Sequence, residues 1–265
     1  MALAGRGVSG AVAYDGGATL TTNLNGLVLS VFPGADLASR RLRLLDLFCG
    51  AGGAARGYQR AGFCVLGVDV NPQPRYAGCQ FVQTDALEYV AEHGHEYDAI
   101  HASPPCQGYS IMRNLPWLKD REYPMLIDPV RELLEQTARP WVIENVMGAH
   151  LSAGWLCGTM FGLPFYRHRA FATSFFWLQP GHPRHLESIR PGHSLAGRAR
   201  EIVFAPRNGI KGGVGHTTGW KAASEAMGID WMKRGELTQA IPPAYTEFIG
   251  RALASAIRQA TRGSE

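Results

Sequence analysis

Short apolar runs recur along the chain from residue 41 onward, and turn-forming residues separate them. Runs of this length that are nearly all apolar or β-branched are typical of strands buried on both faces of a sheet. The pattern predicts strands over residues 42–48, 63–70, 98–102 and 141–143, with another before Asp85. A separate apolar run at residues 27–32 indicates a strand nearer the N-terminus.

Stretches with helical spacing lie between and after these runs. The predicted helices cover residues 54–61, residues 222–227 and the stretch after residue 243. Gly62 suits the C-terminal cap of the first. Asp128 and Pro129 predict another helix start, with the carboxylate as N-cap, and Pro140 ends that helix. Alternating strands and helices predict an α/β fold with a doubly wound, mostly parallel sheet that binds ligands at the carboxyl ends of its strands.

The length of 265 residues and the 46% apolar content suit one α/β domain with a small appendage. We expect an N-terminal extension over 1–40, a catalytic domain over 41–174, a Gly-, Arg- and His-rich segment over 175–219, and a C-terminal part over 220–265 that packs back on the catalytic domain. No apolar stretch is long enough for a membrane span, and no signal sequence is visible, so we expect a cytoplasmic protein.

Charge is unevenly distributed along the chain. The segment from Arg167 to Lys221 contains nine Lys and Arg but only two Glu, which gives it a net charge of +7. The whole chain carries +4. A basic segment in an otherwise acidic protein is typical of a polyanion site, so nucleic acid is the expected partner.

The five cysteines are odd in number and show no C-x-x-C spacing. This pattern favours free thiols over a disulfide framework, and it suggests no zinc site. The sequence therefore predicts no metal.

A glycine-rich turn follows the first predicted strand and contains Gly50, Gly52 and Gly53. Glycines allow close approach of the backbone to a ligand, and the helix start after them presents free N–H groups. Asp69 and Asp85 follow the next two strands, where an acid can bond ribose or base. The turn is not G-x-G-x-x-G, which favours a smaller adenosyl ligand over a dinucleotide. In the alternative interpretation the two acids only cap neighbouring turns.

Three further strand ends or turns carry reactive side chains. Cys106 follows two prolines on a stiff loop, where a thiolate could face a pocket as a nucleophile. Glu144 ends the next strand and could hold and release a proton. Arg167 and Arg169 present guanidinium groups suited to carbonyl oxygens and phosphates, although surface salt bridges are the alternative.

The order D-L-F-C-G-A-G-G, P-P-C-Q, E-N-V and R-H-R over residues 43–260 resembles the C5-cytosine DNA methyltransferase family in its compact, phage-type form. The resemblance implies a class I S-adenosylmethionine-dependent methyltransferase fold, S-adenosyl-L-methionine as cofactor and double-stranded DNA as partner, in restriction-modification or phage DNA modification. It implies cofactor binding by Phe48, Gly50, Gly52, Gly53, Asp69, Val70, Asp85, Ala86, Pro105 and Gln239.

The resemblance also implies the chemistry. Cys106 attacks carbon 6 of a flipped-out cytosine, Glu144 contacts the ring nitrogen and amine, and Arg167 or Arg169 holds the base carbonyl. A loop starting at Gln107 and Ser110 closes over the base. The predicted DNA contacts in the basic segment are Arg184, Arg190, Arg198, Arg200, Arg207 and Lys211.

Two departures from the family pattern stand out. Phe165 occupies the position of a family glutamine, and the late G-N-x-V-P-P element reads T-Q-A-I-P-P, so Gln239 takes the place of the asparagine. The recognition region is also short, which predicts a short target site. A transfer RNA methyltransferase, a catalytically silent DNA-binding relative and a donor of a group larger than methyl remain alternatives, and the oligomeric state stays open.

Overall fold

The computed structural model describes residues 40–110, 122–152, 154–185 and 220–262. The N-terminal extension, with its predicted strand at 27–32, and most of the predicted recognition segment lie outside these ranges. None of the helices within them has the length and apolar character that a bilayer span requires.

A seven-stranded sheet forms the centre of the fold, in the order β3-β2-β1-β4-β5-β7-β6. The strands are β1 (Arg43–Leu47), β2 (Cys64–Asp69), β3 (Gln80–Gln83), β4 (Ala99–Ala102), β5 (Trp141–Asn145), β6 (Gly154–Leu156) and β7 (Arg169–Thr173). All neighbours pair in parallel except β7, which is antiparallel to both β5 and β6. The doubly wound, mostly parallel sheet is therefore confirmed.

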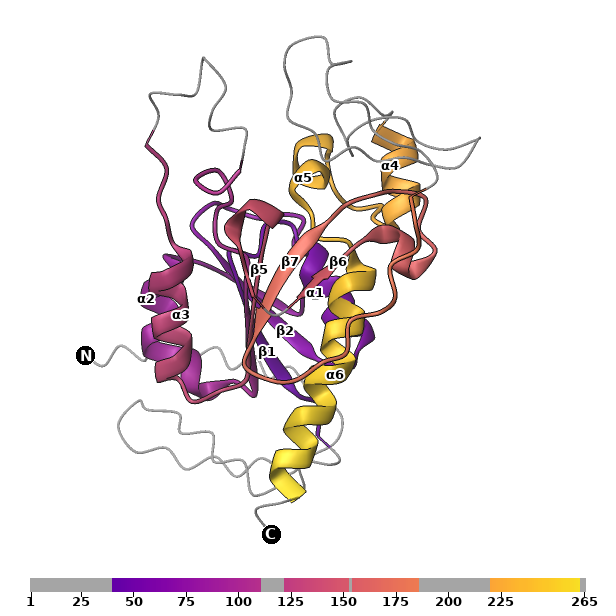
Figure 1. Cartoon of the computed structure of the whole chain (residues 1–265). Helices are drawn as coiled ribbons and strands as arrows, with labels where there is room; N and C mark the ends of the chain where they lie inside the picture. Colours follow the sequence, from indigo (N-terminus) through magenta and orange to yellow (C-terminus); the bar gives the residue numbers. More distant parts are fainter. Residues whose placement is uncertain (1–39, 111–121, 153, 186–219, 263–265) are drawn as a thin grey trace, which may run out of the picture. The chain divides into compact units, whose positions relative to one another are not determined.

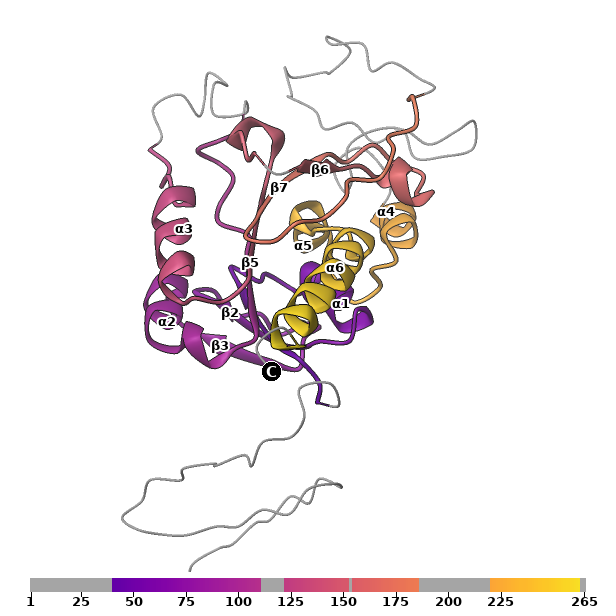
Figure 2. The same ribbon diagram turned by 60° about the horizontal axis from the view of Figure 1, so that its bottom comes forward.

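Helices cover both faces of this sheet (Figures 1 and 2). They are α1 (Gly53–Arg60), α2 (Ala86–His93), α3 (Ile127–Gln136), α4 (Trp220–Met227), α5 (Arg234–Gln239) and α6 (Pro243–Arg262). Successive residues of β1 belong to different cores: Leu44 packs in the one that includes α1 and α6, and Leu45 in the one that includes α2 and α3. This alternation is what a strand buried on both faces requires.

Helices α1 and α6 pack closely because Gly57 has no side chain. A Cβ atom at Gly57 would lie 2.0 Å from Thr246 Oγ1 and 2.2 Å from the Pro243 carbonyl oxygen. The Thr246 hydroxyl donates to the carbonyl of Ala54 at 2.9 Å. The segment before α6 also reaches the first glycine turn, since Trp231 Nε1 donates to the carbonyl of Ala51 at 2.8 Å. The C-terminal residues thus support the strand–turn–helix unit at β1.

One predicted helix start is wrong. Helix α3 begins at Ile127 with Leu126 as N-cap, so Asp128 lies in the first turn and its side chain is not the cap. The Ile127 N–H instead donates to the Tyr109 hydroxyl at 2.9 Å. Pro129 is still compatible with this position, because N–H groups in the first turn have no partner within the helix.

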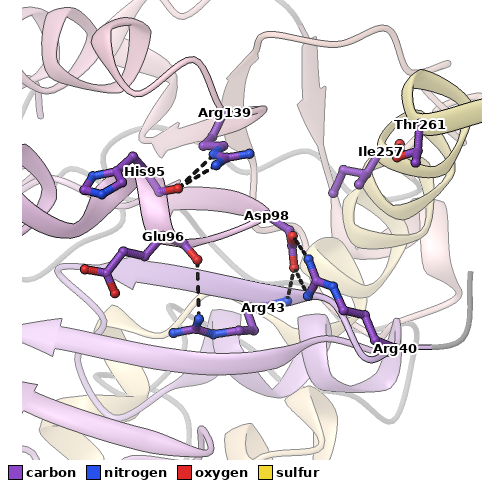
Figure 3. A network of polar contacts seen from close by, with 8 residues as sticks. All are labelled: Arg40, Arg43, His95, Glu96, Asp98, Arg139, Ile257 and Thr261. Atoms are coloured by element: carbon purple, nitrogen blue, oxygen red, sulfur yellow. Dashed lines mark hydrogen bonds and ion pairs between the residues drawn. The ribbon is translucent and has the colours of Figure 1, made fainter. Parts of the chain in front are cut away.

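Polar contacts tie the sheet together at the amino ends of its strands, opposite the predicted site (Figure 3). Asp98, just before β4, accepts hydrogen bonds from the Arg43 N–H at 2.7 Å and from the Arg40 guanidinium. Arg139, before β5, donates two hydrogen bonds to the carbonyl of His95. These polar contacts lie at the amino edge of the sheet, whereas the predicted site residues lie at its carboxyl edge.

Candidate active site

The glycine turn after β1 is held in an unusual backbone conformation. Phe48, Gly50 and Gly52 have φ angles of 58°, 49° and 83°, a left-handed region that disfavours side chains. A Cβ atom at Gly52 would lie 2.7 Å from the Ala77 nitrogen, and one at Gly53 would lie 2.6 Å from the Ile241 carbonyl oxygen. A Cβ at Gly50 would have no atom within 4 Å. Gly52 and Gly53 therefore serve close packing, whereas Gly50 faces open space.

The acids at the ends of β2 and β3 close turns. Asp69 accepts hydrogen bonds from the N–H groups of Gly50 at 3.1 Å and Asn71 at 2.9 Å. Asp85 caps α2, accepting from Leu87 N–H at 2.8 Å and from Glu88 N–H at 3.1 Å. The capping roles that the sequence left open are thus present, and they hold both carboxylates at the carboxyl edge of the sheet.

Two other predicted cofactor residues adjoin these acids. Val70, the first residue after β2, is 65% exposed, which is a high exposure for a valine. Ala86 is buried at the first position of α2. Val70 therefore offers an apolar surface beside the open glycine turn.

The loop with Cys106 starts at the end of β4 and is tied down on two sides. The Ser103 N–H donates to the Leu47 carbonyl at 3.1 Å, and Asn145 Nδ2 donates to the Pro104 carbonyl at 2.8 Å. The Cys106 carbonyl accepts from the N–H of Ser110 at 2.9 Å, which closes a tight turn. Cys106 is half-buried, and none of the five cysteines, all within the described ranges, is disulfide-bonded.

Pro105 and Ser110 are likewise half-buried, and Gln107 is exposed. Pro105, Gln107 and Ser110 belong to the loop that follows β4, together with Cys106. Residues 111–121, the remainder of the predicted closing loop, lie outside the described ranges.

A buried histidine, which sequence reasoning did not single out, lies behind the Cys106 loop. His101 on β4 contacts the Tyr58 hydroxyl through Nδ1 at 2.9 Å and the Ser103 hydroxyl through Nε2 at 2.8 Å. Complete burial lowers the pKa of His101 to about 3, so its ring is neutral at pH 7. A histidine inside an otherwise apolar strand was the available signal.

Glu144 and Arg169 form a buried ion pair. Strand β5 is longer than predicted and includes Glu144, which pairs with Phe171 of β7. Arg169 begins β7, and its Nε lies 2.9 Å from Glu144 Oε1. The side chains are 6% and 9% exposed, so this is not the surface salt bridge considered from sequence. A buried carboxylate needs such a partner to remain charged.

The two arginines of the R-H-R motif differ in their partners. Arg167 is also buried, but its Nη2 donates to the carbonyl of Thr238 at 2.9 Å. Its own carbonyl accepts a hydrogen bond from the Tyr245 hydroxyl. Arg167 therefore joins the sheet to the C-terminal helices, whereas Arg169 faces the carboxylate.

The remaining predicted site residues are dispersed. Gln239 is exposed at the end of α5, next to Ala240 and Ile241, which pack against Gly53. Arg184 is exposed in the loop after β7. The other predicted DNA contacts lie outside the described ranges: Arg190, Arg198, Arg200, Arg207 and Lys211.

At the carboxyl edge of the sheet the structure thus assembles an open glycine turn, two acids at strand ends, a half-buried thiol and a buried carboxylate–guanidinium pair. All of these side chains lie at one edge of an α/β sheet, where open sheets of this kind bind ligands. Residues 42–153 match the family described as C-5 cytosine-specific DNA methylase.

The chain is also similar to proteins described as type II methyltransferases. The chain is 26% identical over 191 residues to the type II methyltransferase M.AgeI of Thalassovita gelatinovora, which covers 57% of this chain and 44% of that protein. It is 27% identical over 113 residues to M.FnuDI of Fusobacterium nucleatum, covering 40% of this chain and 33% of that one. The chain thus spans less than half the length of these curated relatives.

Solved structures show weaker likeness. A protein encoded in an E. coli prophage, provisionally described as a DNA modification methyltransferase, superposes with a TM-score of 0.49 at 15% identity, covering 82% of this chain and 99% of that one. The Dnmt2 methyltransferase of S. pombe gives a TM-score of 0.39 at 20% identity over 51% of this chain and 49% of that one.

Proposed function

We propose that this protein transfers a methyl group from S-adenosyl-L-methionine to carbon 5 of cytosine in DNA, with Cys106 as the nucleophile. The observation that carries the proposal is the hydrogen bond from Asn145 to the Pro104 carbonyl. It fastens the loop with Cys106 to the strand that holds Glu144. A nucleophile and a carboxylate that act on opposite sides of one base must be fixed relative to each other.

The first three strand ends fit the adenosyl cofactor. Gly50 leaves the turn open, since a Cβ there would touch nothing within 4 Å. Phe48 and Val70 offer apolar surface for the adenine, and Asp69 and Asp85 offer carboxylate oxygens for hydroxyl and amine groups. Gly52, Gly53 and Ala86 support the turn and the helix start, with Pro105 and Gln239 at the rim. When bound, S-adenosyl-L-methionine supplies an electrophilic methyl group.

Cys106 and Glu144 make carbon 5 of the base reactive. The Cys106 thiolate forms a bond to carbon 6, and the electron pair of the carbon 5–carbon 6 double bond becomes available at carbon 5 for the methyl group. A proton that Glu144 gives to the ring nitrogen neutralises the negative charge that the thiolate brings to the ring, and the carboxyl group can accept a hydrogen bond from the exocyclic amine. Glu144 takes this proton back when the thiolate leaves. Loss of the carbon 5 proton to a base then restores the double bond and expels the thiolate.

Arg169 has a double task in this scheme. Its guanidinium beside Glu144 keeps the carboxylate in a fixed orientation, and the planar group is suited to donate to the base carbonyl when a base is bound. Arg167 is committed to the Thr238 carbonyl through one nitrogen, so we assign the base contact to Arg169 and a supporting role to Arg167.

The target base has to leave the duplex, because the reacting carbons are stacked within it; flipping costs a few kcal/mol. Gln107 and Ser110 begin the loop that closes over the base. We keep the basic residues after β7, Arg184 among them, as phosphate contacts that position DNA without reading its sequence.

The test is covalent capture. DNA containing 5-fluorocytosine should trap the wild type as a denaturation-resistant adduct in the presence of cofactor, because fluorine cannot leave carbon 5 as a proton does. Cys106→Ala should form no adduct and transfer no methyl group, whereas Cys79→Ser, an exposed cysteine, should behave like the wild type. Transfer by Cys106→Ala at even a few per cent of the wild-type rate contradicts the assignment.

Mass spectrometry of nucleosides from treated DNA and transfer RNA distinguishes the other outcomes. 5-Methylcytosine in DNA supports the proposal, and 5-methylcytosine in transfer RNA alone makes the substrate RNA. A larger mass increment identifies a different donor. Tight DNA binding without any product identifies a silent relative.

A further inference from the structure

Four potential metal ligands converge beside the R-H-R motif, outside the catalytic set. They are Cys157, His168, His182 and His185, and their ligand atoms all lie within 4.8 Å of one another. Cys157 follows β6, His168 lies between Arg167 and Arg169, and the other two belong to the loop after β7. Segments separated by up to 28 residues are thus brought to one point.

The distances within the cluster suit a tetrahedral ion. Cys157 Sγ lies 3.4 Å from His185 Nε2, and the Nε2 atoms of His182 and His185 are 2.9 Å apart. Around a tetrahedral zinc, with bonds of about 2.0–2.3 Å, ligand atoms are separated by about 3.3–3.6 Å. A hydrogen bond between two neutral imidazoles accounts for the 2.9 Å distance. This hydrogen bond does not explain why the Cys157 sulfur and a third imidazole, that of His168, lie within 4.8 Å of the same two rings.

Aromatic rings and a hydroxyl hold the four ligands in position. Tyr166 stacks on His185 with ring centroids 3.7 Å apart and planes within 1° of parallel. Trp155 packs against both His168 and His182, at centroid distances of 5.2 and 4.8 Å. The Thr159 hydroxyl donates to Cys157 Sγ at 3.3 Å. Hydrogen bonds of this kind tune a metal-bound thiolate, and fixed rings keep imidazoles aimed at the metal.

We propose that Cys157, His168, His182 and His185 bind one structural Zn²⁺ ion. One thiolate and three imidazoles are the borderline-soft donors that zinc selects, and four protein ligands leave no position for a reacting water. The site therefore serves architecture: it ties β6, the start of β7 and the loop after β7 together.

The position of His168 connects this site to the base-binding residues. Fixing His168 also fixes its two neighbours, Arg167 and Arg169, and the His168 carbonyl accepts a hydrogen bond from Arg169 Nη1 at 2.9 Å. His182 and His185 belong to the predicted recognition segment, residues 175–219. Zinc at this point would anchor the described first part of that segment, residues 175–185, to the catalytic sheet.

The cysteine spacing alone predicted no metal. The ligands here have the pattern C-x10-H-x13-H-x2-H, with a single cysteine, and β7 lies between His168 and the other two histidines. The H-x-x-H pair at His182 and His185 was the one local signal. The zinc proposal replaces the expectation that the protein needs no metal.

Metal analysis of untagged full-length protein tests the proposal independently of methyl transfer. Protein purified without chelator from zinc-supplemented medium should contain about one zinc per chain by mass spectrometry. Cys157→Ser and His185→Ala should lower zinc affinity by more than about 100-fold, beyond the usual effect of losing an outer-shell partner. The matched controls Cys79→Ser and His95→Ala, both exposed and remote from the cluster, should retain the ion.

Spectroscopy of the wild-type protein tests the metal site without depending on whether the variants fold. Replacing zinc by Co²⁺ should give the intense d–d absorption of a tetrahedral site and a sulfur-to-cobalt charge-transfer band, and X-ray absorption of the zinc protein should give one sulfur and three nitrogen ligands. Three outcomes overturn the proposal: no zinc and no Co²⁺ spectrum in folded wild type, retention of metal by both ligand variants, or a ligand set without sulfur.

Discussion

Asp46 and His101 are opposed in register on β1 and β4, and both are completely buried. Burial raises the pKa of Asp46 well above its usual value, and nearby Asp69 adds to this shift, while Tyr76 acts weakly in the other direction. Burial alone lowers the pKa of His101 to about 3. Both shifts favour neutral side chains, so the two groups give opposite pH dependences of stability.

The signs follow from proton binding. Below its unfolded pKa of about 6.5, His101 takes up a proton only in the unfolded chain, so it reduces stability as pH falls towards 3. Above its unfolded pKa of about 3.9, Asp46 keeps its proton only in the folded protein, so it reduces stability as pH rises. Between about pH 4 and 6.5 the contributions of His101 and Asp46 to the free energy of unfolding change in opposite directions with pH. The pH dependence of wild-type stability therefore reveals neither contribution by itself.

The variant His101→Gln separates them, because an amide retains a donor and an acceptor but does not titrate. With pKa values of about 6.5 unfolded and about 3 folded, His101 lowers the free energy of unfolding by about 2 kcal/mol between pH 7 and pH 5. A folded pKa of about 4 would alter this by only about 0.1 kcal/mol, since the loss at pH 5 depends almost entirely on the unfolded state. The wild type should therefore lose about 2 kcal/mol more than the variant over this range.

Urea denaturation at pH 5, 6 and 7 and constant ionic strength measures the difference. Asp46 and any bound metal are common to both proteins and cancel. His95→Gln, at an exposed histidine, should follow the wild type. A difference between wild type and His101→Gln that stays constant within about 0.5 kcal/mol from pH 7 to pH 5 refutes a neutral, buried His101.

Other substitutions test single contacts. Asp69→Ala should weaken S-adenosyl-L-methionine binding by about 1.5–3 kcal/mol, and an unchanged Kd by isothermal titration leaves this carboxylate with only its turn-closing role. Asp98→Ala should lower the free energy of unfolding, measured in urea, by about 1.5–3 kcal/mol, because it removes the contacts to Arg40. The folded variant should keep the wild-type transfer rate, since these contacts lie at the amino edge of the sheet. A slower rate would contradict the placement of the site at the carboxyl edge. Arg169→Lys keeps a positive charge but loses the planar guanidinium opposite Glu144. Single-turnover transfer should therefore slow at least about tenfold, with cofactor affinity unchanged. Equal rates for variant and wild type argue against a contact between Arg169 and the base.

The parallel part of the fold could be predicted because its strands are nearly continuous apolar runs. Leu44, Leu45 and Leu47 are all fully buried, so local composition and three-dimensional position agree. Strand β7 gave no such signal, since it begins with Arg169, a charge that only Glu144 on another strand makes compatible with burial. Strand β6 has three residues, too few for a pattern.

The same distinction applies to the site. The positions of Cys106 and Glu144 could be predicted because Cys106 lies in the loop directly after the apolar run of β4 and Glu144 lies near the end of the apolar run of β5. The preference for Arg169 over Arg167 could not, because it depends on a contact between Arg167 and Thr238, 71 residues apart. The cluster at Cys157 depends in the same way on the return of β7 between β5 and β6.

Asp69 shows why a capping role and a ligand role need not compete. An ionised carboxylate offers about four lone-pair sites. Oδ2 accepts from the Gly50 N–H, and Oδ1 accepts from the backbone N–H and, at 3.4 Å, from the side-chain amide of Asn71. Oδ2 therefore keeps acceptor capacity for a ribose hydroxyl. The same bonds fix the carboxylate before any ligand arrives, which lowers the entropy cost of binding. The bond to Gly50 also connects the end of β2 to the turn after β1. In the proposed cofactor site, Asp69 would therefore fix the turn through its cap and bind the ligand through its remaining acceptor capacity.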